Sequence, residues 1–270
     1  MRRMIDFECE GDRLEGTLDA GDASTGLLIV SGGNEVRSGA YAGQAAMARH
    51  FAAKGYPVFR YDRRGVGDSE GSNNGFESTA DDIAAAVAAF RTEAPHIDRI
   101  VAFGNCDAAT ALAFFHNGIN SLVLANPWVI EAAISEPGAP TPPSAAAVRA
   151  RYLARLKNPR SLLDLLTGKI DLKKLAGGLA KAAQKETPTG LAARLATSLA
   201  ASSLPTQLLV AERDTTALAF IGAYKTALFE TVRSRANVTL SKCDSASHSF
   251  ADAIAKAWLY DRIASALSGS

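Results

Sequence analysis

One cysteine stands where the sequence would place a nucleophile. Residues 101–110, VAFGNCDAAT, read as a buried strand, a tight turn and a helix, with Cys106 in the turn. Such a crowded turn needs small residues two positions before and after the nucleophile, and Gly104 and Ala108 meet that need. The N-terminus of the following helix would favour a thiolate. Because cysteine is also among the most often buried residues, the turn pattern alone leaves catalysis and simple packing equally open.

The chain has four histidines, and one of them is suitably placed to act on that cysteine. His248 lies in SASHSF, after the last predicted strand and before the last predicted helix. The C-terminal ends of parallel strands line the crevice in which ligands bind, so His248 can reach Cys106 from another strand. The others are less suitable, since we expect His50 within a helix, His96 in a loop before a strand and His116 at a helix end.

An acidic residue after a late strand would orient the histidine. The stretch LLVAERD supplies Glu212 and Asp214, and we choose Asp214 because it lies further into the loop. Its alternative role is that of an ordinary helix N-cap, which is common for aspartate. The chain order is then Cys106, Asp214, His248, which is nucleophile, acid and base.

Attack by Cys106 on a carbonyl would create an oxyanion, which needs N–H donors. The backbone amide of Asp107 is one expected donor, from the geometry of the turn. We expect the second donor at Gly33 or Asn34, which follow the apolar run LLIVS. The Asp107 carboxylate could orient a substrate amine or cap its own helix, and capping is the commoner role.

Apolar runs that alternate with helical segments must position these residues. The pattern predicts an α/β fold with a doubly wound, mostly parallel sheet that begins with an N-terminal hairpin. The predicted hairpin covers residues 4–21, and the predicted strands lie within 25–33, 56–65, 98–105, 119–127, 206–214 and 236–244. The clearest predicted helices lie within 40–55, 76–95, 107–118 and 249–268.

Residues 127–204 interrupt this alternation and are predicted to form a helical lid inserted into a core of residues 1–126 and 205–270. Within 145–203 there are eleven Lys or Arg and three Asp or Glu, a net charge of +8. A basic helical face is usually a solvated surface, but one so concentrated could steer an acidic acyl carrier. The candidate substrate contacts are Arg37, in the loop after the first apolar strand, and Arg149, Arg151 and Arg155 in the insertion.

The bulk composition excludes several classes of protein. With 270 residues and 47% hydrophobic content, the chain can bury one large core with a lid. Its three cysteines make no disulfide framework, no signal peptide is recognisable and no apolar run is long enough to span a membrane, so we expect a cytoplasmic protein. No metal-ligand spacing, phosphate-binding glycine loop or nucleic-acid motif is present, so we expect no cofactor, metal or nucleic acid.

Several motifs together resemble a known superfamily. YDRRGVGDSEG resembles the Asp-x-Arg-Gly-x-Gly-x-Ser segment that follows the fourth core strand of α/β-hydrolases, and the order Cys106, Asp214, His248 matches theirs. More narrowly, SGGNEVRSGAY, FRYDRRGVGDSEG and GNCDAAT resemble the exosortase A system-associated hydrolases, the first of two such families. The resemblance implies an α/β-hydrolase fold and a cysteine at the nucleophile turn, in bacterial proteins encoded near surface-sorting and exopolysaccharide genes. The His-Gly pair that is common in relatives is absent from SGGNEVRSG, which leaves the second oxyanion donor open between Gly33 and Asn34.

A cysteine at this turn predicts a thioester acyl-enzyme, which passes its acyl group to water, amines or thiols. His248 would act as base and then acid, and Asp214 would orient it. The predicted function is a hydrolase or acyltransferase for esters or thioesters, thioesterase-like, with coenzyme A or an acyl carrier protein as the acyl donor. Two alternatives remain: a non-catalytic binding protein on a hydrolase scaffold, and a structural partner of an exopolysaccharide or protein-sorting assembly.

Overall fold

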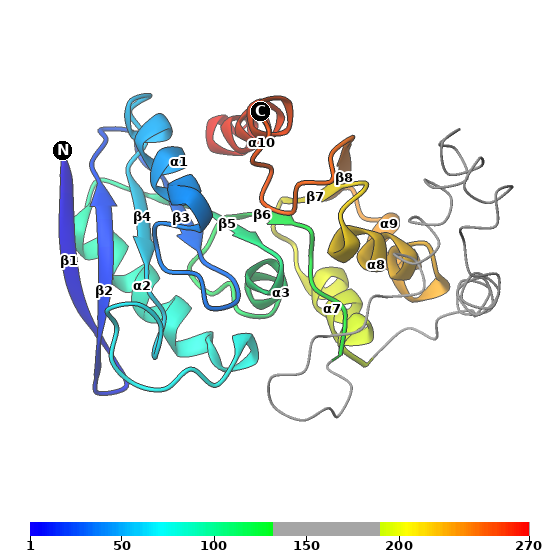
Figure 1. Ribbon diagram of the computed structural model, residues 1–270, viewed down its shortest axis with the longest axis horizontal. Coiled ribbons are helices and arrows are strands. Elements are labelled where there is room, and N and C mark those ends of the chain that lie inside the picture. The colour runs from blue at the N-terminus through cyan, green and yellow to red at the C-terminus, as the bar shows by residue number, and fades with distance from the viewer. Residues whose placement is uncertain (132–189, 270) are drawn as a thin grey trace, which may run out of the picture.

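The computed structural model describes residues 1–131 and 190–269, and in these ranges the chain forms one eight-stranded sheet (Figure 1). The spatial order is β1-β2-β4-β3-β5-β6-β7-β8, antiparallel from β1 to β4 and parallel from there on. The strands are β1 (Arg2–Cys9), β2 (Asp12–Asp19), β3 (Thr25–Val30), β4 (Val58–Tyr61), β5 (Arg99–Asn105), β6 (Ser121–Ala125), β7 (Thr206–Ala211) and β8 (Val238–Cys243). The predicted α/β fold and its mostly parallel sheet are confirmed.

The N-terminal hairpin follows from its turn residues. β1 and β2 are joined by Glu10 and Gly11, both with positive φ, at 52° and 86°. Two successive residues with positive φ give the turn whose twist matches that of the paired strands. The hairpin extends the sheet beyond β4 and stands at the edge away from the predicted site (Figure 1).

The parallel strands end side by side, and this positions the loops that carry chemistry. The strands β3, β5, β6 and β7 are rich in apolar residues and almost entirely buried, as parallel strands covered on both faces must be, whereas the edge strand β8 is only partly buried. In the register, Val30 lies opposite Gly104, and Asn105 lies opposite Ala125. The segments that follow β3, β5 and β6 therefore lie side by side at the C-terminal ends of these parallel strands.

Helices cover both faces of the sheet. On one face α1 (Gly43–Ala52) and α10 (Ala253–Ser268) pack their apolar sides against the strands. The other face is covered by α2 (Ala80–Glu93), α3 (Asp107–Phe114), α7 (Gly190–Ala201), α8 (Thr215–Tyr224) and the short α9 (Glu230–Arg233). Figure 1 shows the two layers, with α1 and α10 on the side opposite α3 and α7.

The predicted insertion, 127–204, coincides with the described chain only at its two ends. At its C-terminal end, α7 packs into the core beside α3, with Leu195 and Leu199 buried and Ser198 Oγ 2.5 Å from the carbonyl oxygen of Ala113. Residues 132–189 lie outside the described residues, and so do the predicted contacts Arg149, Arg151 and Arg155. None of the helices described here combines the length and the apolar character needed to cross a bilayer.

Candidate active site

Cys106 occupies a strained turn between β5 and α3. The backbone angles φ and ψ of Cys106 are 63° and −127°, values that residues other than glycine seldom adopt. A hydrogen bond to the neighbouring strand β6 fixes the turn, because the Cys106 amide donates to the Ala125 carbonyl at 2.9 Å. A Cβ on Gly104 would lie 2.8 Å from the backbone of Ala108, so this position admits only glycine. The thiol is thus presented at the N-terminus of α3 by a conformation that the surrounding backbone enforces.

The structure brings Cys106, His248 and Asp214 together. His248 Nδ1 lies 3.0 Å from Asp214 Oδ2, and the Cys106 side chain lies close enough to the His248 ring to raise its pKa. The Asp214 hydrogen bond, followed by the neighbouring Cys106 side chain, raises the pKa of His248 to about 10, although burial opposes this shift. The imidazole is therefore held in its protonated form at neutral pH. A protonated ring beside the thiol favours the thiolate, the nucleophilic form of cysteine.

Asp214 fills both of the roles that the sequence left open. Its Oδ2 accepts a hydrogen bond from Ala217 N at 3.0 Å, which caps the first turn of α8. The same atom contacts His248. Burial raises the pKa of the Asp214 carboxyl, but the hydrogen bonds from His248 and the Ala217 amide outweigh burial and leave that pKa below its usual value. The carboxylate is therefore ionised and fixed at the end of β7.

The other three histidines lie elsewhere. His50 packs against the rings of Phe51 and Tyr260 on α1 and α10. His96 Nε2 lies 2.9 Å from the carbonyl oxygen of Gly21, and His116 Nδ1 contacts carbonyls at the end of α3. All four histidines of the chain are described, and His248 is the one that contacts Asp214 and whose pKa the Cys106 side chain raises.

Two asparagines that the sequence analysis did not consider hold the His248 loop. Asn126 is completely buried, and its Nδ2 donates to the His248 carbonyl at 3.0 Å and to Asn105 Oδ1 at 3.2 Å. Its Oδ1 accepts from Ala211 N at 2.9 Å. Asn105 Nδ2 donates to the same His248 carbonyl at 3.2 Å. The sequence feature that could have predicted their role is that each asparagine is the first polar residue after an apolar run, at the C-terminal end of a strand where the site lies.

The expected oxyanion loop is tied to Asp107. Gly33 N donates to both carboxylate oxygens of Asp107, at 2.8 and 3.0 Å, and Ala108 N donates to the same carboxylate at 2.9 Å. A Cβ on Gly32 would collide with the Asp107 carboxylate, so glycine is required for this close approach. Among the described residues, nothing accepts a hydrogen bond from the amide N–H of Asn34 or of Asp107 itself.

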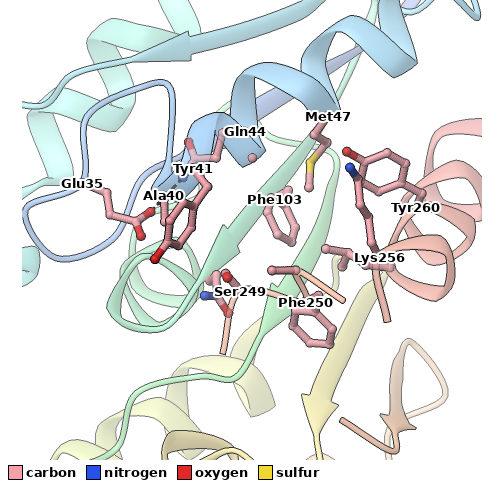
Figure 2. A pocket seen from close by; sticks show the side chains of 14 residues that line it. Glu35, Ala40, Tyr41, Gln44, Met47, Phe103, Ser249, Phe250, Lys256 and Tyr260 are labelled. Carbon is pink, nitrogen blue, oxygen red and sulfur yellow. Dashed lines mark hydrogen bonds between the residues drawn. The ribbon is translucent and has the colours of Figure 1, made fainter. Parts of the chain in front are cut away.

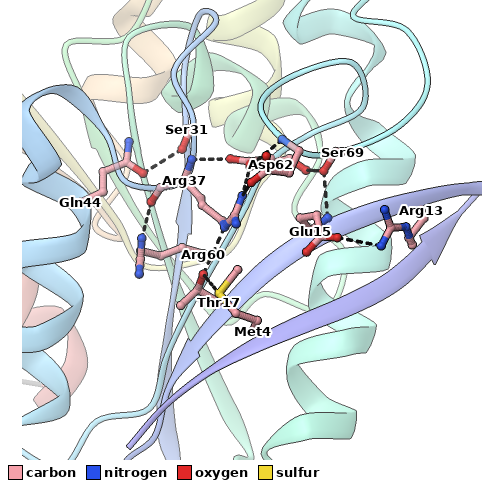
Figure 3. Close-up of polar contacts among 11 residues, drawn as sticks. Met4, Arg13, Glu15, Thr17, Ser31, Arg37, Gln44, Arg60, Asp62 and Ser69 are labelled. Atoms are coloured by element: carbon pink, nitrogen blue, oxygen red, sulfur yellow. Dashed lines mark hydrogen bonds and ion pairs between the residues drawn. The ribbon is translucent and has the colours of Figure 1, made fainter.

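Arg37 lies in a buried ionic network under the same loop (Figure 3). Its amide and its guanidinium both bond the carboxylate of Asp62, which is fully buried, and the guanidinium also contacts Asp68 Oδ2 at 3.0 Å. Arg63, from the same segment, bonds the Gly33 carbonyl. With 13% of its side chain exposed, Arg37 serves here as the counter-ion of Asp62. The segment YDRRGVGDS thus shapes the loop that carries the expected oxyanion donors.

A cavity of about 170 Å³ opens beside the nucleophile, between the 35–44 loop, α1 and α10 (Figure 2). Asn105 and Ser249, the neighbours of Cys106 and His248 in the chain, form part of its wall. The rest of the lining is Glu35, Ala40, Tyr41, Gly43, Gln44, Met47, Phe103, Phe250, Ala251, Lys256, Leu259 and Tyr260. The cavity is therefore mostly apolar, with few charged groups.

The topology is that of an α/β-hydrolase, with the strained turn at Cys106 after β5, Asp214 after β7 and His248 after β8. Residues 22–251 match the hydrolase family described as serine aminopeptidase, S33, and the chain belongs to this family. In this chain the turn after β5 carries Cys106. Within the described residues, no group of histidine, cysteine, aspartate or glutamate could hold a metal ion.

Solved structures agree on the fold. An esterase from Pyrococcus furiosus is 16% identical, with a TM-score of 0.66 over 100% of this chain and 91% of that one. Est1E from Butyrivibrio proteoclasticus, with ferulic acid bound, is 13% identical, with a TM-score of 0.60 over 98% and 100%. The thioesterase domain of the curacin biosynthetic pathway is 14% identical, with a TM-score of 0.57 over 98% and 99%. No curated protein sequence matches the chain.

Proposed function

We propose that the protein is an acyl hydrolase or acyltransferase that forms an acyl-enzyme on Cys106. The observation that carries this proposal is the position of His248, which bonds Asp214 at 3.0 Å and lies close enough to Cys106 for that side chain to raise its pKa. A nucleophile, a base and an orienting carboxylate, placed in this order, are what acyl transfer requires. Membership of a hydrolase family supports the same reaction type.

In the proposed reaction, the Cys106 thiolate attacks the carbonyl carbon of an ester or thioester. The tetrahedral intermediate collapses as His248 donates its proton to the leaving oxygen or sulfur, which leaves an acyl thioester on Cys106. Water, or another acceptor, then attacks that thioester while the neutral His248 takes a proton from it. Asp214 holds the ring in one orientation through both steps and stabilises its charged form.

The oxyanion would be held by two backbone amides. The Asp107 N–H, at the start of α3, is the first, and it has no acceptor among the described residues. For the second we favour the Asn34 N–H over that of Gly33, because the Gly33 N–H already donates to the Asp107 carboxylate. Gly33 could serve only if that carboxylate moved away.

The substrate that we propose is an ester or thioester of thioesterase type, with coenzyme A or an acyl carrier protein as the carrier. The support is the chemistry of cysteine and the excess of eleven basic over three acidic residues in 145–203. The motifs around Cys106 keep the exosortase A system-associated hydrolases as the narrower family that we propose. The cytoplasm remains the proposed location, and the three cysteines are free thiols in the structure.

Intact-protein mass spectrometry after brief exposure to acyl-coenzyme A and p-nitrophenyl esters tests the proposal. Wild type should gain one acyl group that maps to Cys106, and Cys106→Ala should gain none. The matched control is Cys243→Ala, which removes a buried thiol near the site and should be acylated like wild type. His248→Ala should be acylated far more slowly. An adduct that persists in Cys106→Ala would overturn the assignment of the nucleophile.

A further inference from the structure

The cavity beside Cys106 contains a single carboxylate, that of Glu35. Ser31 Oγ donates to Gln44 Oε1 at 2.8 Å, which leaves the Gln44 amide group to donate to Glu35 Oε2 at 3.3 Å. This chain of hydrogen bonds holds the carboxylate toward the cavity (Figure 2). Near Glu35, the lining of the cavity consists mainly of the aromatic ring of Tyr41 and apolar side chains.

No described basic side chain forms an ion pair with Glu35, although a charge in this place is unfavourable. Burial raises the pKa of the Glu35 carboxyl and the Asp107 carboxylate raises it further, whereas the charge of His248 and the hydrogen bonds from the Ala40 amide and the Gln44 side chain lower it. The net shift is upward. His248 pairs with Asp214 rather than with Glu35, so the Glu35 carboxylate has no ion-pair partner among the described residues, and a cationic ligand would supply one.

Tyr41 adds a second feature that suits a cation. Its ring is fully exposed at the cavity mouth, and Figure 2 shows it beside Glu35. The backbone is held in the left-handed region at Tyr41 and at Ala42, with φ of 51° and 56°, which is uncommon for residues with a side chain. An aromatic face next to a carboxylate is an arrangement that attracts ammonium groups.

We propose that this cavity binds a small substrate that carries a primary ammonium group, which pairs with Glu35 and lies against Tyr41. The inference rests on the acyl-transfer function proposed above and names the class of its substrate. An engineered cavity of about 150 Å³ holds a benzene molecule, so a space of similar size admits an alkylamine of four or five carbons. The wall formed by Met47, Phe103 and Leu259 would contact the alkyl part.

The other charged group in the lining does not occupy the Glu35 end. Lys256 projects from α10 on the opposite side of the cavity, and its Nζ lies 5.8 Å from the centre of the Tyr260 ring (Figure 2). The cavity therefore has a negative end near the nucleophile and a positive end at α10. An ammonium group is attracted to the first and repelled from the second, which fixes its orientation.

Binding alone provides the first test, independent of catalysis. Saturation-transfer NMR would compare butylammonium with butan-1-ol in wild type, in Glu35→Gln and in the control Glu8→Gln, which changes an exposed carboxylate on β1. We expect wild type and the control to prefer butylammonium and Glu35→Gln to lose that preference. Since charge-assisted hydrogen bonds contribute about 1.5–3 kcal/mol, the affinity should fall about tenfold or more. Equal binding to wild type and Glu35→Gln would overturn the proposal.

Two kinetic arms then identify the source of the ammonium group. In the first, p-nitrophenyl acetate acylates Cys106 and butylamine competes with water. The amine nitrogen attacks the thioester carbonyl, the carbon–sulfur bond breaks, and of the two protons lost by the ammonium one goes to His248 and one to solvent. In the second arm, kcat/KM is compared for p-nitrophenyl 4-aminobutanoate and p-nitrophenyl pentanoate. A Glu35-dependent preference in the first arm identifies an amine acceptor, and in the second an amine-bearing acyl group.

The arms also separate this proposal from the proposed function. If Cys106 is acylated but neither the product ratio nor the donor preference changes by as much as threefold in Glu35→Gln, the ammonium site is wrong and the acyl-enzyme stands. If Cys106 is not acylated while butylammonium binding still depends on Glu35, the ammonium site stands and the acyl-enzyme proposal is wrong. The mass of the protein and the NMR signal are read on the same samples, so each idea has its own readout.

Discussion

Asp214 Oδ2 accepts two hydrogen bonds, and two substitutions can separate what each contributes. One bond comes from Ala217 N at 3.0 Å and caps α8, and the other comes from His248 Nδ1 at 3.0 Å. Asp214→Asn keeps an oxygen for the cap but removes the negative charge. Asp214→Ala removes both the cap and the charge. If our account is correct, both variants lose reactivity and the stability that comes from the pairing with His248, and only the second also loses the stability of the cap.

The expected sizes follow from the burial of the site. Asp214 is 6% exposed, so its charge-assisted bond is little screened, and losing a bond of about 1.5–3 kcal/mol slows acylation by about 10- to 100-fold. Asparagine is as good an N-cap as aspartate, so Asp214→Asn keeps the cap and loses only what the pairing with protonated His248 contributes to stability. Asp214→Ala loses the cap as well, so its free energy of unfolding should lie about 1 kcal/mol below that of Asp214→Asn, which lowers Tm by a further ~2–4 °C in a chain of this length.

Stopped-flow release of p-nitrophenol measures the acylation rate, and scanning calorimetry measures Tm, on the same preparations. Iodoacetamide alkylation of Cys106 against pH adds a readout that a merely structural role would not change. With Asp214→Asn, alkylation at neutral pH should be slower than in wild type, because His248 loses the partner that raises its pKa. The reasoning fails if Asp214→Asn acylates at the wild-type rate, or if its Tm falls as far as that of Asp214→Ala.

Three further predictions concern the surroundings of the site. Asn126→Ala removes the bonds to the His248 carbonyl and Ala211 N, and we expect a loss of about 2–4 kcal/mol in urea denaturation, with slower acylation; an unchanged midpoint would contradict this. The pKa of His248 is raised from 6.5 to about 10, so its contribution to stability is full below pH 6.5 and is lost as the pH rises through about 10. The Tm difference between wild type and His248→Ala should shrink across that range, and a difference that grows would refute the sign. Gly32→Ala should push the Asp107 carboxylate away from the Gly33 N–H and relieve its repulsion of the oxyanion, so kcat for a small neutral ester should rise, and an unchanged or lower kcat would contradict this.

The parts of the site that were predictable depend on short stretches of sequence. The turn at Cys106 needs small neighbours within four residues, and those neighbours are visible in GNCDAAT. His248 and Asp214 each follow an apolar run, so their place at the C-terminal edge follows from the strand that precedes them. The choice between capping and orienting at Asp214 could not be made from sequence, because one carboxylate oxygen does both.

The parts that were missed depend on pairs far apart in the chain. Asn126 reaches the His248 carbonyl across 122 positions, and only the order of β5, β6 and β7 brings the two together. Arg37 looked available to a substrate, but Asp62, 25 positions later, is buried and needs a counter-ion. Whether a side chain already has a bonding partner depends on residues that the folded sheet brings together from distant parts of the chain. The spacing of residues within a motif does not contain this information.

The contact between Asp107 and Gly33 limits which substrates the site can serve well. A carboxylate bound to the Gly33 N–H stands beside the position where an oxyanion would form. Like charges in a partly buried site repel each other, and this repulsion would slow the formation of the oxyanion. An oxyanion held by the amides of Asn34 and Asp107 still feels that charge, and Glu35 adds to it. A positive group on the substrate reduces this repulsion, whereas a neutral ester leaves it in full. The same two carboxylates that make a neutral substrate slow therefore favour one that carries an ammonium group.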